Sequence, residues 1–276
     1  MNRKLGMNVC GLCVPTRTEG LEIMKKAGFE CFFTGAFHYD EVAELKEKAD
    51  TLGLDFDFIH GPFHGINGIN AMWLSGVDYH QLFCDMKESI DSAAACGVPT
   101  VVIHVSSGWN APQVNDLGLA RYDELVLYAK DKGVKIAFEN LRKLGNVAYF
   151  VDRYDKMSNV GFCFDCGHEH CYTPNVCWPD VFTTKLICTH LHDNHGPAKV
   201  DAVEREDEHL LPFDGTYDFT RMIRKLDEYN YTGSLMMELS QRYCDVIVRR
   251  WQDFTGQEAA LEDGGKTFAQ AKEERP

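Results

Sequence analysis

The chain has 276 residues, of which 45 % are hydrophobic and 25 % are charged, a balance typical of a large globular domain. Its 28 basic and 42 acidic residues give a formal net charge of −14, which disfavours nucleic acid and anionic membranes as partners. No apolar run approaches the roughly 20 residues that span a bilayer. Met1–Gly6 lacks the apolar core of a signal peptide, so we expect a cytoplasmic protein.

Short apolar runs alternate with segments of helical periodicity along most of the chain. The runs are rich in Val, Ile, Phe and Leu and almost continuously apolar, as expected for strands of a parallel sheet that is covered on both faces. In chain order, the predicted strands are Leu5–Cys10, Glu30–Phe33, Asp55–His60, Thr100–His104, Lys135–Glu139, Val160–Asp165, Leu186–His190 and Ser234–Glu238.

Between these runs, apolar residues recur at helical spacing. The clearest case follows Asp218, an expected N-cap residue, and places Phe219, Met222, Ile223, Leu226 and Tyr229 on one face. Comparable patterns occupy Val42–Leu52 and Leu119–Ala129, and expected helix ends lie at Gly28, Gly53, Gly97 and Gly133. Eight strand–helix units in this length predict an α/β fold, a closed (β/α)₈ TIM barrel. An open dinucleotide-binding sheet would need a GxGxxG turn, which the sequence lacks.

We expect one TIM-barrel domain over residues 1–276, with a polar C-terminal segment from about Gly256. Many of the 11 cysteines lie inside apolar runs, which favours reduced, buried thiols over disulfides. Two CxxC pairs exist, Cys10–Cys13 and Cys163–Cys166. Residues three apart on a strand point to opposite faces, which argues against a zinc knuckle at the second pair.

The active site of an α/β barrel lies at the carboxyl ends of its strands. Each of the last six predicted strands ends with an acidic residue or a histidine: His60, His104, Glu139, Asp165, His190 and Glu238. One such residue would be ordinary where a strand meets solvent, but the shared position of all six predicts a divalent-metal site. Manganese and zinc suit these ligands best, with cobalt and magnesium as alternatives.

More candidate ligands lie just beyond the strand ends. His168 follows Asp165, and His192 follows His190 in a run that ends with Asp193 and Asn194. Asp207 and His209 lie in a long segment before the helix that starts at Asp218, and long loops in compact domains are often functional.

Several short motifs carry a resemblance to a known family. They are His-Gly-Pro-Phe at 60–63, Ile-His at 103–104, Phe-Glu-Asn at 138–140, Asp-Cys-Gly-His at 165–168, His-Leu-His-Asp-Asn at 190–194, Asp-Glu-His at 207–209 and Met-Glu-Leu at 237–239. Over about residues 5–240, the chain resembles the xylose isomerase-like TIM barrels. That family comprises sugar and sugar-phosphate isomerases and epimerases, together with metal-dependent abasic-site endonucleases.

The resemblance implies one metal held by Glu139, Asp165, His190 and Glu238. His190 is preferred over His192 because the family ligand is followed three residues later by an acid, here Asp193. His168, Asp207 and His209 match a further metal site of the endonucleases, so the resemblance allows for a second metal ion at these residues. The remaining metal-binding histidines of the endonucleases match His60 and His104.

We assign substrate contact to His60, His104, Trp109, His168 and His192. Among the aromatic candidates Phe63, Trp73 and Trp109, we favour Trp109 because it closely follows the strand that ends at His104.

These residues predict a divalent-metal-dependent isomerase or epimerase that acts on a keto-sugar or a sugar phosphate through an enediolate. Glu139 and Glu238 would be the proton-transfer pair. The nearest alternative is an abasic-site phosphodiesterase, which we favour less because Arg142, Lys143, Lys199 and Arg205 are isolated rather than clustered. A sugar dehydratase or lyase is a further alternative, because its reaction would begin with the same proton abstraction. The non-enzyme alternative is a barrel that serves only as a binding protein or as a partner subunit. Barrels of this kind often form dimers, so a homo-oligomer stays a possible assembly.

Overall fold

The computed structural model describes residues 2–12, 14–197 and 207–239, together with the isolated positions 252, 256–260, 267 and 270. The chain divides into two compact units, Met1–Leu239 and Ser240–Pro276. The named helices and strands all lie in the first unit. The predicted organisation as one barrel domain with a polar segment from about Gly256 stays a prediction. Cys13, Lys199, Arg205 and most of that segment lie outside the described residues.

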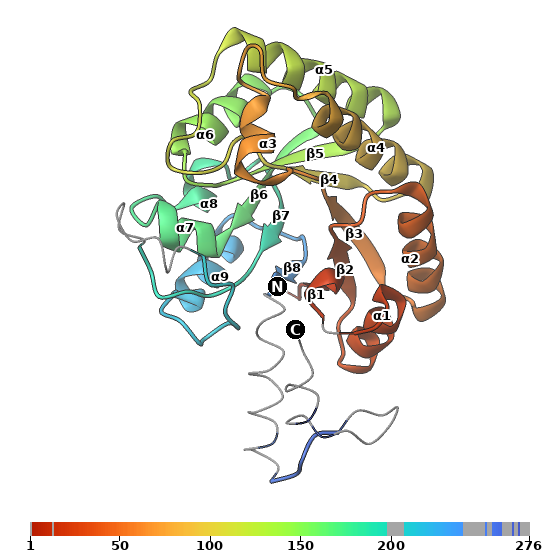
Figure 1. The fold of residues 1–276 in the computed structure, drawn as a ribbon. Coiled ribbons are helices and arrows are strands. Elements are labelled where there is room, and N and C mark those ends of the chain that lie inside the picture. Colours follow the sequence, from red (N-terminus) through yellow and green to blue (C-terminus); the bar gives the residue numbers. More distant parts are fainter. Residues whose placement is uncertain are drawn as a thin grey trace. The chain divides into compact units, whose positions relative to one another are not determined.

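Eight parallel strands form the barrel, and from β1 to β7 each strand pairs with the next one in the chain (Figure 1). They are β1 (Leu5–Asn8), β2 (Cys31–Thr34), β3 (Asp55–His60), β4 (Thr100–Ile103), β5 (Lys135–Glu139), β6 (Val160–Asp165), β7 (Leu186–His190) and β8 (Leu235–Met237). β1 also pairs with β8, and Leu191 bridges to Met237 just beyond β7. The predicted (β/α)₈ TIM barrel is confirmed, and its strand bounds agree closely with the apolar runs.

The helices lie outside the ring of strands (Figure 1). They are α1 (Arg17–Lys26), α2 (Tyr39–Leu52), α3 (Gly65–Ala71), α4 (His80–Cys96), α5 (Asp116–Lys132), α6 (Leu144–Arg153), α7 (Cys166–Tyr172), α8 (Trp178–Val181) and α9 (Phe219–Glu228). Asp218 caps α9 as predicted, because its side chain accepts a hydrogen bond from the Arg221 N–H. Within the described residues, no helix is both long enough and apolar enough to cross a membrane.

β1 is shorter than the apolar run that predicted it. The strand ends at Asn8, and the next residues form a single 3₁₀ turn, η1 (Val9–Gly11). The Asn8 side chain causes this change, because its Oδ1 accepts a hydrogen bond from the Cys10 N–H at 2.9 Å and so turns the chain. Cys10 is thereby brought to the mouth of the barrel, where it lines a cavity.

The interior of the barrel is packed with small and sulfur-containing side chains as well as aromatic rings. The buried cluster consists of Cys31, Phe33, Phe58, Val102, Ala137, Cys163, Cys188 and Met236. β1 contributes Gly6, where an added Cβ would lie 2.5 Å from the Met236 sulfur, so a larger residue would not fit without displacement. The described cysteines carry free thiols. This packed interior forms the floor beneath the strand-end residues.

Candidate metal centre

Acidic and imidazole side chains from four neighbouring strands meet at the mouth of the barrel. The ligand atoms of Glu139, Asp165, His190 and Glu238 all lie within 4.8 Å of one another, and we call these residues the first group. His190 Nδ1 lies 3.1 Å from Glu238 Oε2, 3.4 Å from Glu139 Oε1 and 3.8 Å from Asp165 Oδ2. These are the four ligands that the sequence motifs predict, and their spacing suits a shared cation.

His190 provides the test of whether the first group fits a metal. Its side chain is completely buried, yet neither ring nitrogen makes a hydrogen bond with any residue that the structure describes. Buried polar side-chain atoms normally have a hydrogen-bond partner. Because Nδ1 faces three carboxylates without a hydrogen bond, a cation held between the imidazole and these oxygens would satisfy the group. The residues therefore fit a divalent metal.

The charges of the first group compensate one another. Burial raises the pKa of Glu139, but the charges of His190 and His104 outweigh it and bring the pKa well below its usual range. For His190 the directions are reversed: burial lowers the pKa of the imidazole, but the charges of Glu238 and Glu139 raise it to about 10. Ionised carboxylates in such a buried place require positive charge beside them, which a protonated imidazole or a bound cation supplies.

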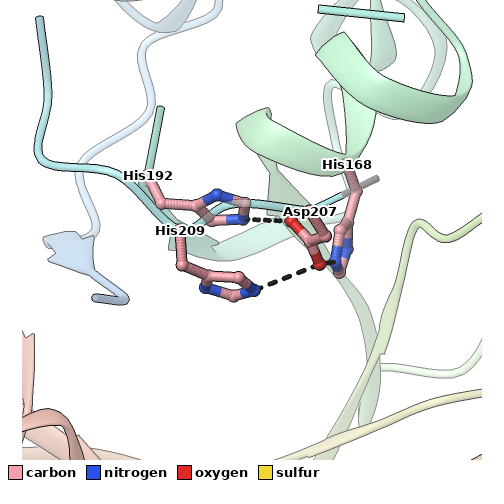
Figure 2. Close-up of side chains that lie close together, drawn as sticks. All are labelled: His168, His192, Asp207 and His209. Carbon is pink, nitrogen blue, oxygen red and sulfur yellow. Dashed lines mark hydrogen bonds and ion pairs between the residues drawn. The ribbon is translucent and has the colours of Figure 1, made fainter. Parts of the chain in front are cut away.

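A second group of possible ligands lies beside the first. His168 on α7, His192 just after β7, and Asp207 and His209 have ligand atoms within 4.8 Å of one another (Figure 2). Asp207 Oδ2 lies 3.0 Å from His168 Nε2 and 3.1 Å from His209 Nε2. The rings of His192 and His209 stack with their centroids 3.9 Å apart. Three imidazoles and one carboxylate are a ligand set that zinc favours.

Two observations in the second group support a metal. Asp207 Oδ1 and His192 Nδ1 are buried and make no hydrogen bond within the described part of the chain. Burial raises the pKa of Asp207, but the charges of His168, His209 and His192 bring it well below its usual range. His192, which the sequence assigns to substrate contact, is completely buried here and does not line the cavity described below.

Gly167 allows His192 to take this position. A Cβ at residue 167 would lie 2.0 Å from His192 Cε1, so the imidazole packs directly against the backbone of α7. Any side chain at this position would push the ring away. The glycine of the Asp-Cys-Gly-His motif is therefore explained by a contact with the His-Leu-His-Asp-Asn motif.

His60 and His104 approach the other oxygen of Glu139. Their Nε2 atoms lie 3.4 Å and 3.1 Å from Glu139 Oε2, and the three residues form another set with metal-ligand spacing. Glu139 Oε1 faces His168 Nδ1 at 3.1 Å and His190 Nδ1 at 3.4 Å. Glu139 thus lies at the centre of the site, with each carboxylate oxygen directed at a different pair of histidines.

A cavity of about 410 Å³ opens onto these residues. The polar residues that line it include His60, His104, Glu139, Arg142, His168, Asp207, His209 and Glu238, and the apolar ones include Phe33, Phe63, Ile66 and Leu141. The volume suits a small organic molecule. Of the predicted substrate-contacting histidines, His60, His104 and His168 line the cavity, and all three also belong to sets with metal-ligand spacing.

The aromatic candidates take different places. Phe63 lines the cavity, whereas Trp109, the favoured candidate, does not; its ring packs edge-on against Tyr172 with centroids 5.7 Å apart. Trp73 is 2 % exposed and donates a hydrogen bond to the Val105 carbonyl, so it packs in the core. Sequence reasoning gave no role to Ile66 and Leu141, which line the cavity because of where α3 and the β5–α6 connection lie. No motif marks either residue.

Residues 21–266 match the profile of the xylose isomerase-like TIM barrel family. The chain belongs to this family. The uncharacterised protein y4fM of Sinorhizobium fredii is 30 % identical over 167 residues, which cover 55 % of this chain and 51 % of that protein. The uncharacterised protein MJ1311 of Methanocaldococcus jannaschii is 27 % identical over 263 residues, 86 % of this chain and 84 % of that protein. An inosose dehydratase of Glaesserella parasuis is 27 % identical over 136 residues, 44 % of this chain and 46 % of the dehydratase. The matches to y4fM and the dehydratase thus span about half of those relatives.

Solved structures of sugar epimerases share the fold of this family member. A D-tagatose 3-epimerase-like protein superposes with a TM-score of 0.69 at 19 % identity, over 92 % of this chain and 98 % of that one. The 3-keto-D-glucoside 4-epimerase of E. coli gives a TM-score of 0.66 at 16 % identity, over 92 % of this chain and all (100 %) of the epimerase. At such identities the likeness establishes the architecture, and the chemistry must be argued from the site.

Proposed function

We propose that the chain is a divalent-metal-dependent isomerase or epimerase that acts on a keto-sugar or a sugar phosphate. The observation that carries the proposal is the first group, whose four ligand atoms lie within 4.8 Å of one another beside a cavity of about 410 Å³. The epimerases among the structural neighbours and the dehydratase relative support it, because each acts on a polyhydroxylated substrate according to its name.

Glu139, Asp165, His190 and Glu238 would hold the metal. When bound there, a divalent cation supplies positive charge beside substrate oxygens that become negative as a proton leaves the adjacent carbon. Three of the four ligands are carboxylates, which favours manganese in this group, whereas the three histidines of the second group favour zinc.

Glu139 and Glu238 are our candidates for moving the proton. They come from β5 and from the residue after β8, and both line the cavity. The Glu238 side chain is 17 % exposed and the Glu139 side chain 1 %, so Glu238 is the more accessible base. The histidines around Glu139 hold its pKa low, which keeps its carboxylate ionised. In this scheme, Glu238 removes a proton from the carbon next to the carbonyl. Glu139 would take up a proton from water or from a substrate hydroxyl and return it to carbon from the other side of the substrate.

Proton exchange with solvent tests this assignment directly. Purified protein loaded with Mn²⁺ is incubated with ketoses and ketose phosphates in D₂O, and deuterium incorporation at carbon is followed by NMR. We expect Glu139→Gln and Glu238→Gln to lose incorporation by about 100-fold or more. Glu88→Gln, on the outer surface of α4 where Glu88 pairs with His38, is the matched control. Unchanged incorporation in both site variants would exclude the proton-transfer pair.

The further ligand sets support a second candidate, a metal-dependent phosphodiesterase. The second group and the His60–His104 pair offer cation positions beyond the one that an epimerase needs, and hydrolysis of a phosphodiester uses cations at both the attacking and the leaving oxygens. The net charge of −14 opposes a nucleic acid substrate. Cleavage of an abasic-site oligonucleotide, without conversion of any ketose, would favour this candidate. Loss of water from an inosose or keto-sugar would indicate a dehydratase instead.

A further inference from the structure

The segment between β3 and α4 forms one wall of the cavity. It contains α3 and contributes Phe63 and Ile66 to the lining. Ile66 is 54 % exposed, and exposed apolar side chains in a concave site are typical of ligand contact. The loop after β4 passes directly beside it, because a Cβ added at Gly108 would lie 3.3 Å from Ile66 Cγ2. Ser107, the residue before Gly108, lines the same cavity, so a serine and an isoleucine border this part of it.

Asn70 on α3 holds the backbone of Ser107 at both of its polar groups. Asn70 Nδ2 donates a hydrogen bond to the Ser107 carbonyl at 2.8 Å, and Asn70 Oδ1 accepts one from the Ser107 N–H at 3.0 Å. Satisfying the backbone N–H and C=O of one residue in this way does what a neighbouring strand does for residues in a sheet. The position of Ser107 is therefore set by α3.

α3 is in turn fixed to the body of the barrel. Arg121 of α5 donates hydrogen bonds at 2.9 Å to two carbonyls at the C-terminal end of α3. Trp73, just beyond, donates its indole N–H to the Val105 carbonyl at 2.8 Å. These bonds join α3 to α5 and to the loop that carries Ser107. A group held in this way is positioned before a ligand arrives, which lowers the entropy cost of binding.

The Ser107 hydroxyl is a candidate for contact with a ligand. It forms no hydrogen bond with any residue that the structure describes, whereas the Ser107 backbone is fully bonded. Residues 61–79 and 105–115, from which this wall is built, contain no lysine or arginine. The wall thus offers a neutral hydrogen-bonding group beside apolar surface. The carbon chain of a sugar presents the same combination, with hydroxyl groups on its edges and C–H groups on its faces.

We propose that Ser107 is a specificity-determining residue whose hydroxyl binds a hydroxyl group on a non-reacting carbon of the substrate, and that Asn70 is its positioning residue. The inference rests on the proposed function and deepens it. Ser107 follows β4, which pairs with β5, so it lies on the Glu139 side of the mouth. A keto-sugar whose reacting carbon lies between Glu139 and Glu238 extends its remaining hydroxyl groups toward this wall, and Ile66 packs against its C–H groups. A serine hydroxyl can donate and accept, so it suits a sugar hydroxyl in either role.

A comparison of hydroxyl deletions in the protein and in the ligand tests this contact. Titration calorimetry on the Mn²⁺-loaded protein first ranks D-fructose, D-tagatose, D-psicose and D-fructose 6-phosphate, and then compares the tightest ligand with its monodeoxy analogues. Ser107→Ala should bind the tightest ligand about 3- to 10-fold more weakly, the loss expected for one neutral hydrogen bond. One analogue should bind the unsubstituted protein more weakly by a similar factor. Ser107→Ala should no longer distinguish that analogue from its parent, because the serine partner of the deleted hydroxyl is already gone.

Asn70→Ala and a matched control complete the test. Asn70→Ala should reduce the discrimination against that same analogue while the relative affinities of the other analogues stay unchanged, whereas a general loss of structure would weaken all ligands alike. Ser92→Ala removes a buried hydroxyl of α4 that lies outside the cavity lining and has no hydrogen-bond partner among the described residues. This control should bind every ligand as the unsubstituted protein does.

Two outcomes would overturn the role of Ser107. One is an unchanged affinity of Ser107→Ala for the tightest ligand, and the other is a loss in Ser107→Ala that is the same for the parent and for every monodeoxy analogue. Full discrimination in Asn70→Ala would overturn the role of Asn70. If no ligand binds the unsubstituted protein, the proposed function fails together with this inference. If a ketose binds with the expected pattern but incorporates no deuterium, only the proposed isomerisation fails.

Discussion

Asp193 is expected to hold the second group in place without binding metal itself. The side chain is completely buried, and it accepts three backbone hydrogen bonds. Oδ1 accepts from the N–H groups of Asn194 and Tyr217 at 2.8 and 3.0 Å, and Oδ2 accepts from that of Phe213 at 3.0 Å. Asp193 also exchanges two backbone hydrogen bonds with Leu210. The carboxylate thus ties the segment directly after Asp207 and His209 to the end of β7.

Asp193→Ala should detach this segment and weaken the second group. A hydrogen bond to a charged group contributes about 1.5–3 kcal/mol, so three of them set an upper range of roughly 4–9 kcal/mol if the segment cannot move. The segment is partly accessible, and Phe213 is 80 % exposed, so the freed N–H groups can reach water. We therefore expect a loss of about 2–4 kcal/mol in the free energy of unfolding, together with loss of the metal held by His168, Asp207 and His209.

Metal content and chemical denaturation measure the two effects. Elemental analysis of Asp193→Ala should show fewer metal ions per chain than the unsubstituted protein, while the cation of the first group is retained. Asp131→Ala, at an exposed site on α5, serves as the control and should match the unsubstituted protein in both assays. Our reasoning fails if Asp193→Ala keeps the full metal content and unfolds within about 0.5 kcal/mol of the unsubstituted protein, the range typical of surface substitutions.

Three further predictions concern the interior, the second group and the cavity. Asp57→Asn should stabilise the protein at pH 7 but not at pH 3, as measured by urea denaturation. Burial raises the pKa of Asp57 in the folded state despite the hydrogen bond that Ser234 donates to it. The stability of the unsubstituted protein therefore falls as the pH rises from the pKa of Asp57 in the unfolded state through its pKa in the folded state. An equal gain at both pH values would contradict this cause. Gly167→Ala should lower the free energy of unfolding by about 1–3 kcal/mol and should also lower the metal content of the second group, because the added Cβ would overlap the His192 ring. Normal metal content in this variant would show that the ring can move freely. Phe63→Ala should raise KM more than Trp109→Ala does, with kcat less affected, because Phe63 lines the cavity and Trp109 does not; steady-state kinetics that rank the two variants the other way would refute this.

The barrel and the first group could be predicted from the sequence because both depend on local patterns. Apolar runs such as Lys135–Glu139 mark buried strands, and the barrel brings their carboxyl ends together whatever the intervening helices do. His190 Nδ1 faces three carboxylates, and the choice of His190 over His192 as the ligand of the first group stays a prediction. The fold class placed the six strand-end residues at one mouth of the barrel, and the family resemblance singled out Glu139, Asp165, His190 and Glu238 among them.

The second group and the cavity wall could not be fully predicted, because they depend on contacts between distant segments. His192 turns inward because Gly167, on another element, leaves room for its ring. Asp207 and His209 reach α7 because Asp193 fixes the segment that follows them. Trp109 was favoured because it is close in sequence to His104, whereas in the structure its ring packs against Tyr172. In each case the deciding contact joins residues that no spacing rule relates.

The two groups differ in the structures that carry them, and this difference bears on their roles. The first group comes from the ends of β5, β6 and β7 and the residue after β8, so paired strands fix the positions of its ligands. The second group combines His168 on α7 and His192 just after β7 with Asp207 and His209, which are held by partly buried polar contacts. A cation in the first group therefore meets a preorganised set of oxygens beside the cavity, as charge stabilisation in a reaction requires. A cation in the second group would fasten the segment with Asp207 and His209 to α7 and to the end of β7, because its four candidate ligands come from these separate segments.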